Sequence, residues 1–167
     1  FGVLEVLRPA FTPAAFALLV TLVDGWLRTT GRHAVTEALV AAGVAGRRDH
    51  TAFHRFFARG TWDPDAVGRA LFGALVAWLA PHVAAVALVV DDTLAPHKGP
   101  HVFGLGCHLD AVRSTKRRKV FAFGHVWVVL AVVVPVPFAT RGWALPVAFR
   151  LYRTEAAAPR AAARVGS

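Results

Sequence analysis

The sequence of 167 residues contains no methionine and a single cysteine, Cys107. One cysteine excludes an intramolecular disulfide framework and a zinc site built from several cysteines. Acidic residues are also scarce, because 10 Asp and Glu stand against 19 Lys and Arg, for a formal charge of +9. This excess of positive charge favours a nucleic acid as the partner. The absence of methionine even at position 1 indicates either a piece of a longer reading frame or a chain begun at a non-standard start.

Charged residues make up only 17% of the chain and apolar residues 56%, which excludes a disordered polar segment. Two windows, 71–90 and 120–139, approach the run of about 20 apolar residues that a membrane helix needs. Pro81 and His82 interrupt the first window, and a histidine and two prolines interrupt the second. We therefore interpret each window as buried elements of a globular protein outside the membrane, with a small membrane protein as the alternative.

The N-terminal half carries the spacing and the end signals of α-helices. Thr12 before Pro13 and Asp63 before Pro64 are typical of helix starts, because the first residue caps and the proline occupies the first turn. Apolar residues then recur at helical spacing. These signals predict helices over residues 12–30, 34–44, 50–59 and 63–80.

A short polar turn joins the second and third of these helices. Such a pair forms either a helix–turn–helix that places residues 50–59 in a DNA groove, or a small bundle with a basic face. The cations of this region, Arg47, Arg48 and Arg55, would contact DNA in the first interpretation and form an ordinary basic face in the second. Both interpretations place the same aromatic side chains in the core: Phe53, Phe56 and Phe57.

The pattern changes near residue 81, after which aliphatic and aromatic runs favour β-strands. We expect strands over residues 83–90, 120–134 and 143–153, with a long loop over 94–119. The middle segment is either one long strand or a strand and a bend. The expected fold class is α+β, with a helical, DNA-contacting domain over residues 1–81 and a second domain over residues 82–167.

Two adjacent carboxylates follow the first of these strands, in the segment VALVVDDTLAPHKG of residues 86–99. Asp91 and Asp92 come directly after buried aliphatic residues, where a charge is costly unless it reaches solvent or binds something. Carboxylates at a strand end can hold Mg²⁺, which prefers oxygen ligands. The alternative is an ordinary turn, because Asp-Asp-Thr is also a common strand exit.

A basic run lies between the first two expected strands. Five of the seven residues from 113 to 119 are cations: Arg113, Lys116, Arg117, Arg118 and Lys119. Such a run can neutralise several phosphates and give salt-dependent binding without sequence preference. The alternatives are a solvated hairpin loop or a localisation-like basic patch.

An ordered series of segments resembles a known family. The series runs VVDDTLAPHKGPHVFGLGCHLD, RSTKRRKVFAFGHVWVVLAVVVPVPF and WALPVAFRLYR, preceded by LRPAFTPAAF and AFHRFFARGTWDPDAVGRALF. Together they look like the front half of a DDE-type insertion-sequence transposase. The similarity is greatest to the insertion-sequence-four branch, where the first acidic motif commonly reads Asp-Asp-Thr followed by Lys-Gly. The resemblance covers roughly residues 7–153 of this chain.

The resemblance implies a ribonuclease-H-like α/β core, here truncated, behind an N-terminal helical domain. It implies two Mg²⁺ or Mn²⁺ ions held by Asp, Asp and Glu. It also implies hydrolysis of a DNA strand at the element's end, followed by joining to target DNA. The first Asp corresponds to Asp91, with Asp92 as the fallback, and Lys98 would contact phosphate nearby. The implied partners are the transposon ends and target DNA, with a homo-oligomer in the full-length form, and the implied location is cytoplasmic and nucleoid-associated.

The chain departs from the family pattern at the other two acidic positions. After Asp110 the sequence holds a single acidic residue, Glu155, which comes too early for the family's Glu. One or two carboxylates cannot hold a pair of metal ions. We therefore expect an N-terminal transposase fragment that does not cleave DNA by itself. A non-catalytic DNA-binding module is the alternative from another functional class.

Overall fold

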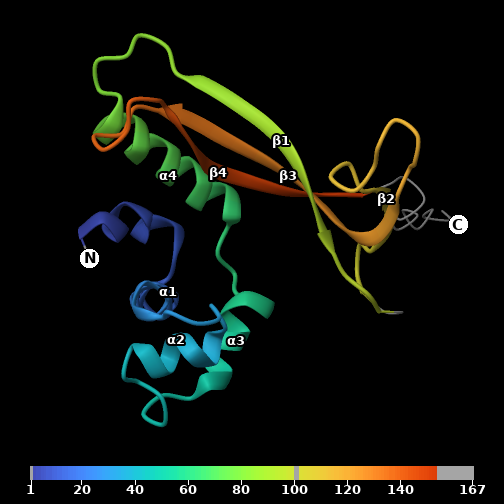
Figure 1. The fold of residues 1–167 in the computed structure, drawn as a ribbon. Helices are drawn as coiled ribbons and strands as arrows, with labels where there is room; N and C mark the ends of the chain where they lie inside the picture. Colours follow the sequence, from blue (N-terminus) through green and yellow to red (C-terminus); the bar gives the residue numbers. More distant parts are fainter. Residues whose placement is uncertain (1, 100–101, 154–167) are drawn as a thin grey trace, which may run out of the picture. The chain divides into compact units, whose positions relative to one another are not determined.

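The computed structural model describes residues 2–99 and 102–153 (Figure 1). The chain divides into two compact units, Phe1–Trp78 and Leu79–Ser167. Helices make up the first unit and an antiparallel sheet makes up the second, which confirms the expected α+β class. The sheet is consistent with the first strands of a ribonuclease-H-like core. Across both described ranges, no helix is long and apolar enough to cross a membrane.

The helical unit follows the start signals in the sequence. Thr12 caps the helix that begins at Pro13, because its hydroxyl accepts a hydrogen bond from the backbone N–H of Ala15. Asp63 likewise accepts from the N–H of Asp65 at the start of the last helix. The helical elements are a 3₁₀ helix η1 (Gly2–Ala10), α1 (Pro13–Arg28), α2 (Val35–Ala41), α3 (His50–Ala58) and α4 (Pro64–Leu79).

A glycine in a left-handed conformation lies in the turn that follows the end of α2. Gly43 has a φ of 70°, a backbone conformation that favours glycine. Its N–H bonds to the carbonyl of Val40, and the N–H of Val44 bonds to that of Leu39, which is the Schellman pattern of a helix end. α2 is shorter than the helix expected over residues 34–44, since its last residue is Ala41 and the turn follows from Ala42.

The core of the helical unit lies among α1, α2 and α3. Its buried members are Leu22, Ala38, Leu39, Phe53 and Phe56, none more than 5% exposed. The expectation for Phe57 is wrong, because half of its surface is exposed. Its ring still packs edge-on against Phe56, at 5.0 Å between ring centroids.

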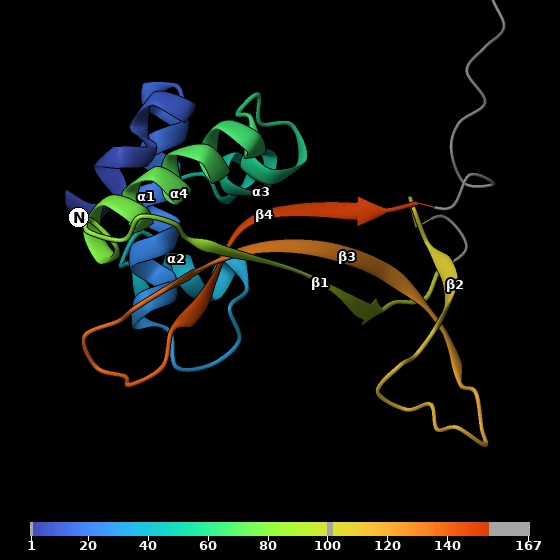
Figure 2. The same ribbon diagram turned by 90° about the horizontal axis from the view of Figure 1, so that it is seen from above.

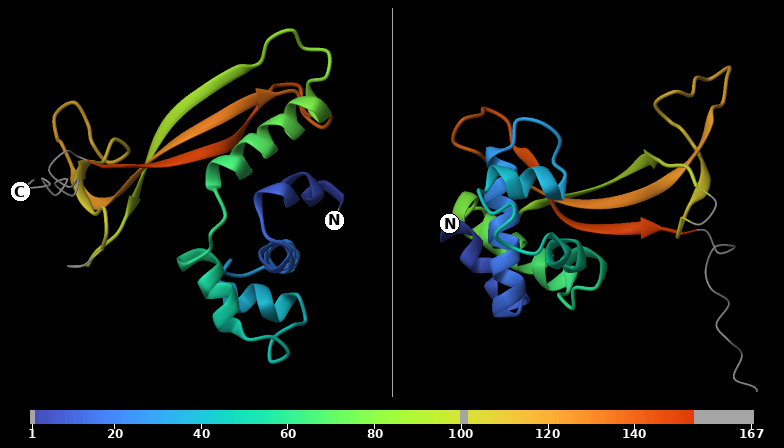
Figure 3. Two further views of the ribbon diagram at one scale, coloured as in Figure 1. Left: turned by 180° about the vertical axis from the view of Figure 1, so that it is seen from behind. Right: turned by 90° about the horizontal axis from the view of Figure 1, so that it is seen from below.

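The sheet is built around one long central strand. The four strands are β1 (Ala87–Pro96), β2 (Gly106–Leu109), β3 (Phe121–Val134) and β4 (Trp143–Tyr152). All three neighbours run antiparallel to β3: β1 lies along one side, while β4 and β2 pair with successive stretches of it. Figure 2 shows β3 between β1 and β4, and Figure 3 shows β2 at one end of β3.

The strand boundaries confirm some expectations and correct others. β3 is one strand of 14 residues, one of the two possibilities that the sequence left open. The expected strand over 83–90 is wrong in its bounds, since β1 runs from Ala87 to Pro96. β1 continues because β3 offers pairing partners as far as Gly124, which is opposite Pro96. β2 was not expected and lies inside the segment interpreted as a loop.

Candidate metal and nucleic-acid sites

The two adjacent carboxylates lie in the middle of β1 and not at its end. Asp91 pairs with Val129 of β3, and Asp92 pairs with Val128. Successive side chains of a strand point to opposite faces of a sheet. Asp91 and Asp92 therefore belong to different faces. Both are exposed to solvent, which removes the burial cost that a charge inside a strand would otherwise carry.

One backbone contact links the two residues. The carboxylate oxygen Oδ1 of Asp91 accepts a hydrogen bond from the N–H of Asp92 at 2.9 Å. The other carboxylate oxygen of Asp91 has no protein partner in the described hydrogen bonds. Asp91 thus keeps one free oxygen to offer to a ligand.

A hollow of about 250 Å³ lies beside Asp91 on the sheet. Asp91 and Thr93 are two residues apart on β1 and therefore lie on the same face of the sheet. They pair with Val129 and Trp127 of β3. Asp92 also borders the hollow, although strand alternation directs its side chain to the other face. The full lining is Val89, Asp91, Asp92, Thr93, Val129, Ala131 and Ala144. Apart from the Asp91 carboxylate and the Thr93 hydroxyl, the side chains on this face of the lining are apolar.

The donor set can be compared with what a metal pair needs. Within residues 2–99 and 102–153, no three His, Cys, Asp or Glu side chains lie close enough to hold a metal ion. Asp91 and Asp92 each offer one carboxylate, on opposite faces. A single carboxylate suits Mg²⁺ only when water or substrate phosphate supplies the other ligands. The described residues therefore do not fit a two-metal centre on their own, and Glu155 lies outside them.

Lys98 follows β1 by two residues and is exposed. The preceding residue, His97, is tied to the sheet because its N–H bonds to the carbonyl of Phe123 at 3.0 Å. Lys98 is not among the residues that line the hollow beside Asp91. The structure therefore places this cation near the end of β1 without joining it to the carboxylates.

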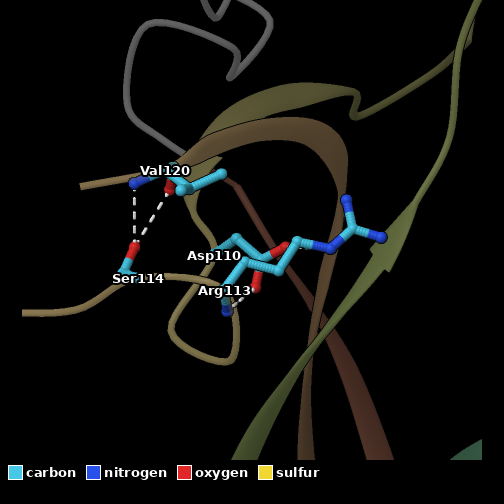
Figure 4. Close-up of polar contacts among 4 residues, drawn as sticks. All are labelled: Asp110, Arg113, Ser114 and Val120. Atoms are coloured by element: carbon cyan, nitrogen blue, oxygen red, sulfur yellow. Dashed lines mark hydrogen bonds and ion pairs between the residues drawn. The ribbon is translucent and has the colours of Figure 1, made fainter. Parts of the chain in front are cut away.

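The basic run lies in the loop of residues 110–120, which joins β2 to β3 and is called the basic loop below. Its two ends are paired, because the N–H of Asp110 donates to the carbonyl of Val120 at 2.9 Å. Figure 4 shows the side chains that close this base. The Asp110 carboxylate accepts from the N–H of Arg113 at 3.0 Å. The Ser114 hydroxyl accepts from the N–H of Val120 at 2.9 Å.

The tip of the basic loop is a tight turn. The N–H of Thr115 donates to the carbonyl of Arg118 at 2.8 Å, and the Thr115 hydroxyl accepts from the N–H of Arg118 at 3.0 Å. Lys116 and Arg117 occupy the two positions between them. All four cations from Lys116 to Lys119 are exposed. Arg113 differs from them, because its Nε lies 3.5 Å from Oδ2 of Asp110.

The remaining cations belong to the helical unit. Arg47 and Arg48 lie in the turn before α3, Arg55 lies on α3, and all three are exposed. The cap of α3 is acidic: Asp49 accepts from the N–H of Thr51 at 2.9 Å. Hydrogen bonds from Thr51 hold the pKa of the Asp49 carboxyl below its ordinary value. The three cations and the acidic cap are thus all exposed on α3 or in the turn before it.

Sequence reasoning missed the anchoring role of Asp110. The signal was present, since Asp110, Ser114 and Thr115 are residue types that bond to nearby backbone in turns. This turn signal was overlooked, because the neighbouring run of cations suggested only a charged loop. The structure therefore adds a hydrogen-bonded base to what the sequence indicated only as a charged loop.

Comparison with known protein families gives a match. The family model described as DDE superfamily endonuclease matches residues 6–166. Neither the curated proteins nor the solved structures give a match to this chain.

Proposed function

The chain belongs to the DDE superfamily endonuclease family, and from this premise we propose that it is the N-terminal part of a DNA transposase. A DDE endonuclease acts on DNA, so the reaction class is nuclease or transposase chemistry. The proposed activity of the full-length enzyme is cleavage of a DNA strand at the element's end and transfer of its 3′-hydroxyl to target DNA. The membership of the insertion-sequence-four branch rests on the Asp-Asp-Thr motif that begins at Asp91.

The observation that carries the proposal is the pair of exposed carboxylates in β1 of a chain from this family. Asp91 has a free carboxylate oxygen beside a hollow of about 250 Å³, so we assign it the role of first metal-ligating Asp. Asp92 remains the alternative on the opposite face. In the full-length enzyme Asp91 would supply one carboxylate oxygen to a Mg²⁺ or Mn²⁺ ion, and the metal would supply Lewis-acid chemistry for cleavage of the DNA strand.

The same proposal assigns DNA contacts to the exposed cations. In the sheet unit these are Lys98 and the cations of the basic loop: Arg113, Lys116, Arg117, Arg118 and Lys119. In the helical unit they are Arg47, Arg48 and Arg55. Each cation that contacts a phosphate releases a counterion when DNA binds. The chain alone is proposed to bind DNA without cleaving it, since each face of the sheet offers one carboxylate.

The DNA-binding part of this proposal is tested by a salt titration. Binding of a labelled duplex to the purified 167-residue chain is followed by fluorescence anisotropy at increasing salt. Lys116→Ala and Arg117→Ala should each reduce the slope of log affinity against log salt by about 0.9, because each removes one phosphate contact. Arg141→Ala is the matched control, an exposed cation in the turn between β3 and β4.

The expected control result is an unchanged slope for Arg141→Ala. Absence of salt-dependent DNA binding by the unmodified chain would contradict the proposed function. Equal slope changes in all three variants would contradict the role of the basic loop, because binding would then follow net charge alone.

A further inference from the structure

The basic loop divides into two sets of residues with different surroundings. One set forms its hydrogen-bonded base, and the other set points its charges into solvent. We infer that Asp110 and Ser114 are positioning residues that hold the loop in the conformation that binds DNA phosphates. In this division the backbone N–H of Arg113 belongs to the base, while its exposed guanidinium and the four cations from Lys116 to Lys119 make the phosphate contacts. The inference rests on the proposed function, since it requires that the loop binds DNA.

Asp110 is placed to organise the base. Among the described residues it is the only charged one that is buried, with 7% of its surface exposed. Its backbone carbonyl accepts from the N–H of Ser114 at 2.9 Å, and its carboxylate accepts from the N–H of Arg113. A buried carboxylate stabilises its surroundings only when it is bonded in this way. Asp110 thus fixes the first turn of the loop from three sides: N–H, carbonyl and carboxylate.

Ser114 closes the other end of the base. Its hydroxyl accepts from the N–H of Val120 at 2.9 Å and lies 3.3 Å from the carbonyl oxygen of the same residue, to which it donates (Figure 4). Asp110, which follows the last residue of β2, is therefore paired with Val120, which precedes the first residue of β3. Thr115 then ties the tip to Arg118. The base and the tip of the loop are thus held by the side chains of Asp110, Ser114 and Thr115, none of which is one of the four exposed cations.

This construction opposes the repulsion among the cations. Four consecutive positive charges favour an extended chain in which the side chains separate. Binding phosphate with such a chain would require ordering the backbone and the side chains together, which weakens association. The base orders the backbone in advance. An acidic residue beside a phosphate is otherwise unfavourable, so the presence of Asp110 at this place is explained by its structural bonds.

Two substitutions of Asp110 separate its bonds from its charge. Asp110→Asn removes the negative charge but keeps an Oδ1 acceptor for the Arg113 N–H. Asp110→Ala removes the same charge together with the acceptor. The inference predicts that Asp110→Asn binds a labelled duplex at least as tightly as the unmodified chain. Asp110→Ala should bind about fivefold more weakly than Asp110→Asn at every salt concentration, with the same salt slope.

Trypsin gives a second readout that does not depend on DNA. Cleavage after Lys116 or Arg117 requires the loop to open locally, so its rate reports the order of the backbone. Asp110→Ala and Ser114→Ala should be cleaved in the loop faster than Asp110→Asn and the unmodified chain. Circular dichroism checks that each variant keeps its fold, and Ser114→Ala decides the outcome if Asp110→Ala unfolds.

The outcomes distinguish the inference from the proposed function. Equal DNA affinity and equal trypsin cleavage of Asp110→Ala and Asp110→Asn would overturn the inference, while salt-dependent binding by the unmodified chain would leave the proposed function standing. Absence of DNA binding by the unmodified chain would overturn both the inference and the proposed function, even if slow trypsin cleavage still showed an ordered loop. Weaker binding with a reduced salt slope in Ser114→Ala would also overturn the inference, since it would make the effect one of lost contacts.

Discussion

The helical unit and the sheet unit use similar amounts of apolar sequence in different ways. In the helical unit, Leu22, Ala38 and Phe53 are completely buried within one cluster. In the sheet, Val132 and Val134 of β3 are fully buried, yet Leu88 and Val90 of β1 are 53% and 66% exposed. Burial in the sheet therefore depends on the strand and not on the residue type.

This difference shows that an apolar sequence does not by itself indicate that its side chains are buried. β3 has partners on both sides, whereas among the described strands β1 pairs only with β3. Strands of an α/β core read as continuous aliphatic runs, because both faces are covered in the complete fold. β1 has this kind of sequence without this kind of burial in the part of the chain that the structure describes.

The largest expected effect comes from opening the helical core. Phe53→Ala should lower the free energy of unfolding by about 3–5 kcal/mol, because it removes a fully buried aromatic ring and leaves a cavity. Phe57→Ala on the same helix is the control, and it should cost much less because half of Phe57 is exposed. Urea unfolding followed by the helical circular dichroism signal measures both. Equal losses would contradict the closed core around Phe53.

A matched pair of valines tests the contrast within the sheet. Val132→Ala should cost about 2 kcal/mol, because Val132 has no exposed surface. Val90→Ala should change stability by less than about 0.5 kcal/mol, because Val90 is 66% exposed. The unfolding midpoint in urea gives both values. A larger loss at Val90 than at Val132 would reverse the comparison between β1 and β3.

The exposed aliphatic surface of β1 should promote self-association of the chain. Val90→Lys should weaken this association about tenfold, because it places a charge on an apolar edge strand. Val3 has the same exposed fraction, 66%, but lies in the helical unit, so Val3→Lys is the control. Sedimentation velocity over a range of concentrations measures the association. A monodisperse monomer in every variant would contradict this account of the surface.

The smallest effect concerns the cap of α3. Because folding lowers the pKa of Asp49, its ionised form stabilises the folded state above the pKa that it has when unfolded. This contribution should be lost as the pH falls through the folded pKa. Asp49→Asn keeps an oxygen acceptor for Thr51 but cannot titrate. The difference in stability between the two proteins should therefore shrink as the pH is lowered from about 7 to about 3. A pH-independent difference would contradict the assigned shift.

Local signals in the sequence predicted the helices well. The capping residues Thr12 and Asp63 bind N–H groups that are close to them in the sequence, at Ala15 and Asp65. The start of each helix can therefore be predicted from a short segment. The bounds of β1 were missed, because they depend on how far β3 extends as a partner. That pairing joins Pro96 to Gly124, and no local propensity records it.

The sequence named candidate site residues, but it did not indicate how the fold arranges them. The Asp-Asp-Thr motif indicated two carboxylates at a strand end, but a strand that continues through them separates Asp91 from Asp92. The basic run was visible as charge, whereas its base depends on a pairing between Asp110 and Val120 across the loop. Charge and residue type are local properties of a sequence, and strand alternation and loop closure are not.

The central claim is that this chain carries DNA-contacting cations and an incomplete set of metal-ligating carboxylates. The most direct measurement incubates the purified chain with a labelled DNA duplex and Mg²⁺ or Mn²⁺, and compares it with Asp91→Asn and Asp92→Asn. We expect both variants and the unmodified chain to bind the duplex and to leave both strands uncut. Metal-dependent strand cleavage by the unmodified chain that is lost in Asp91→Asn would contradict the account.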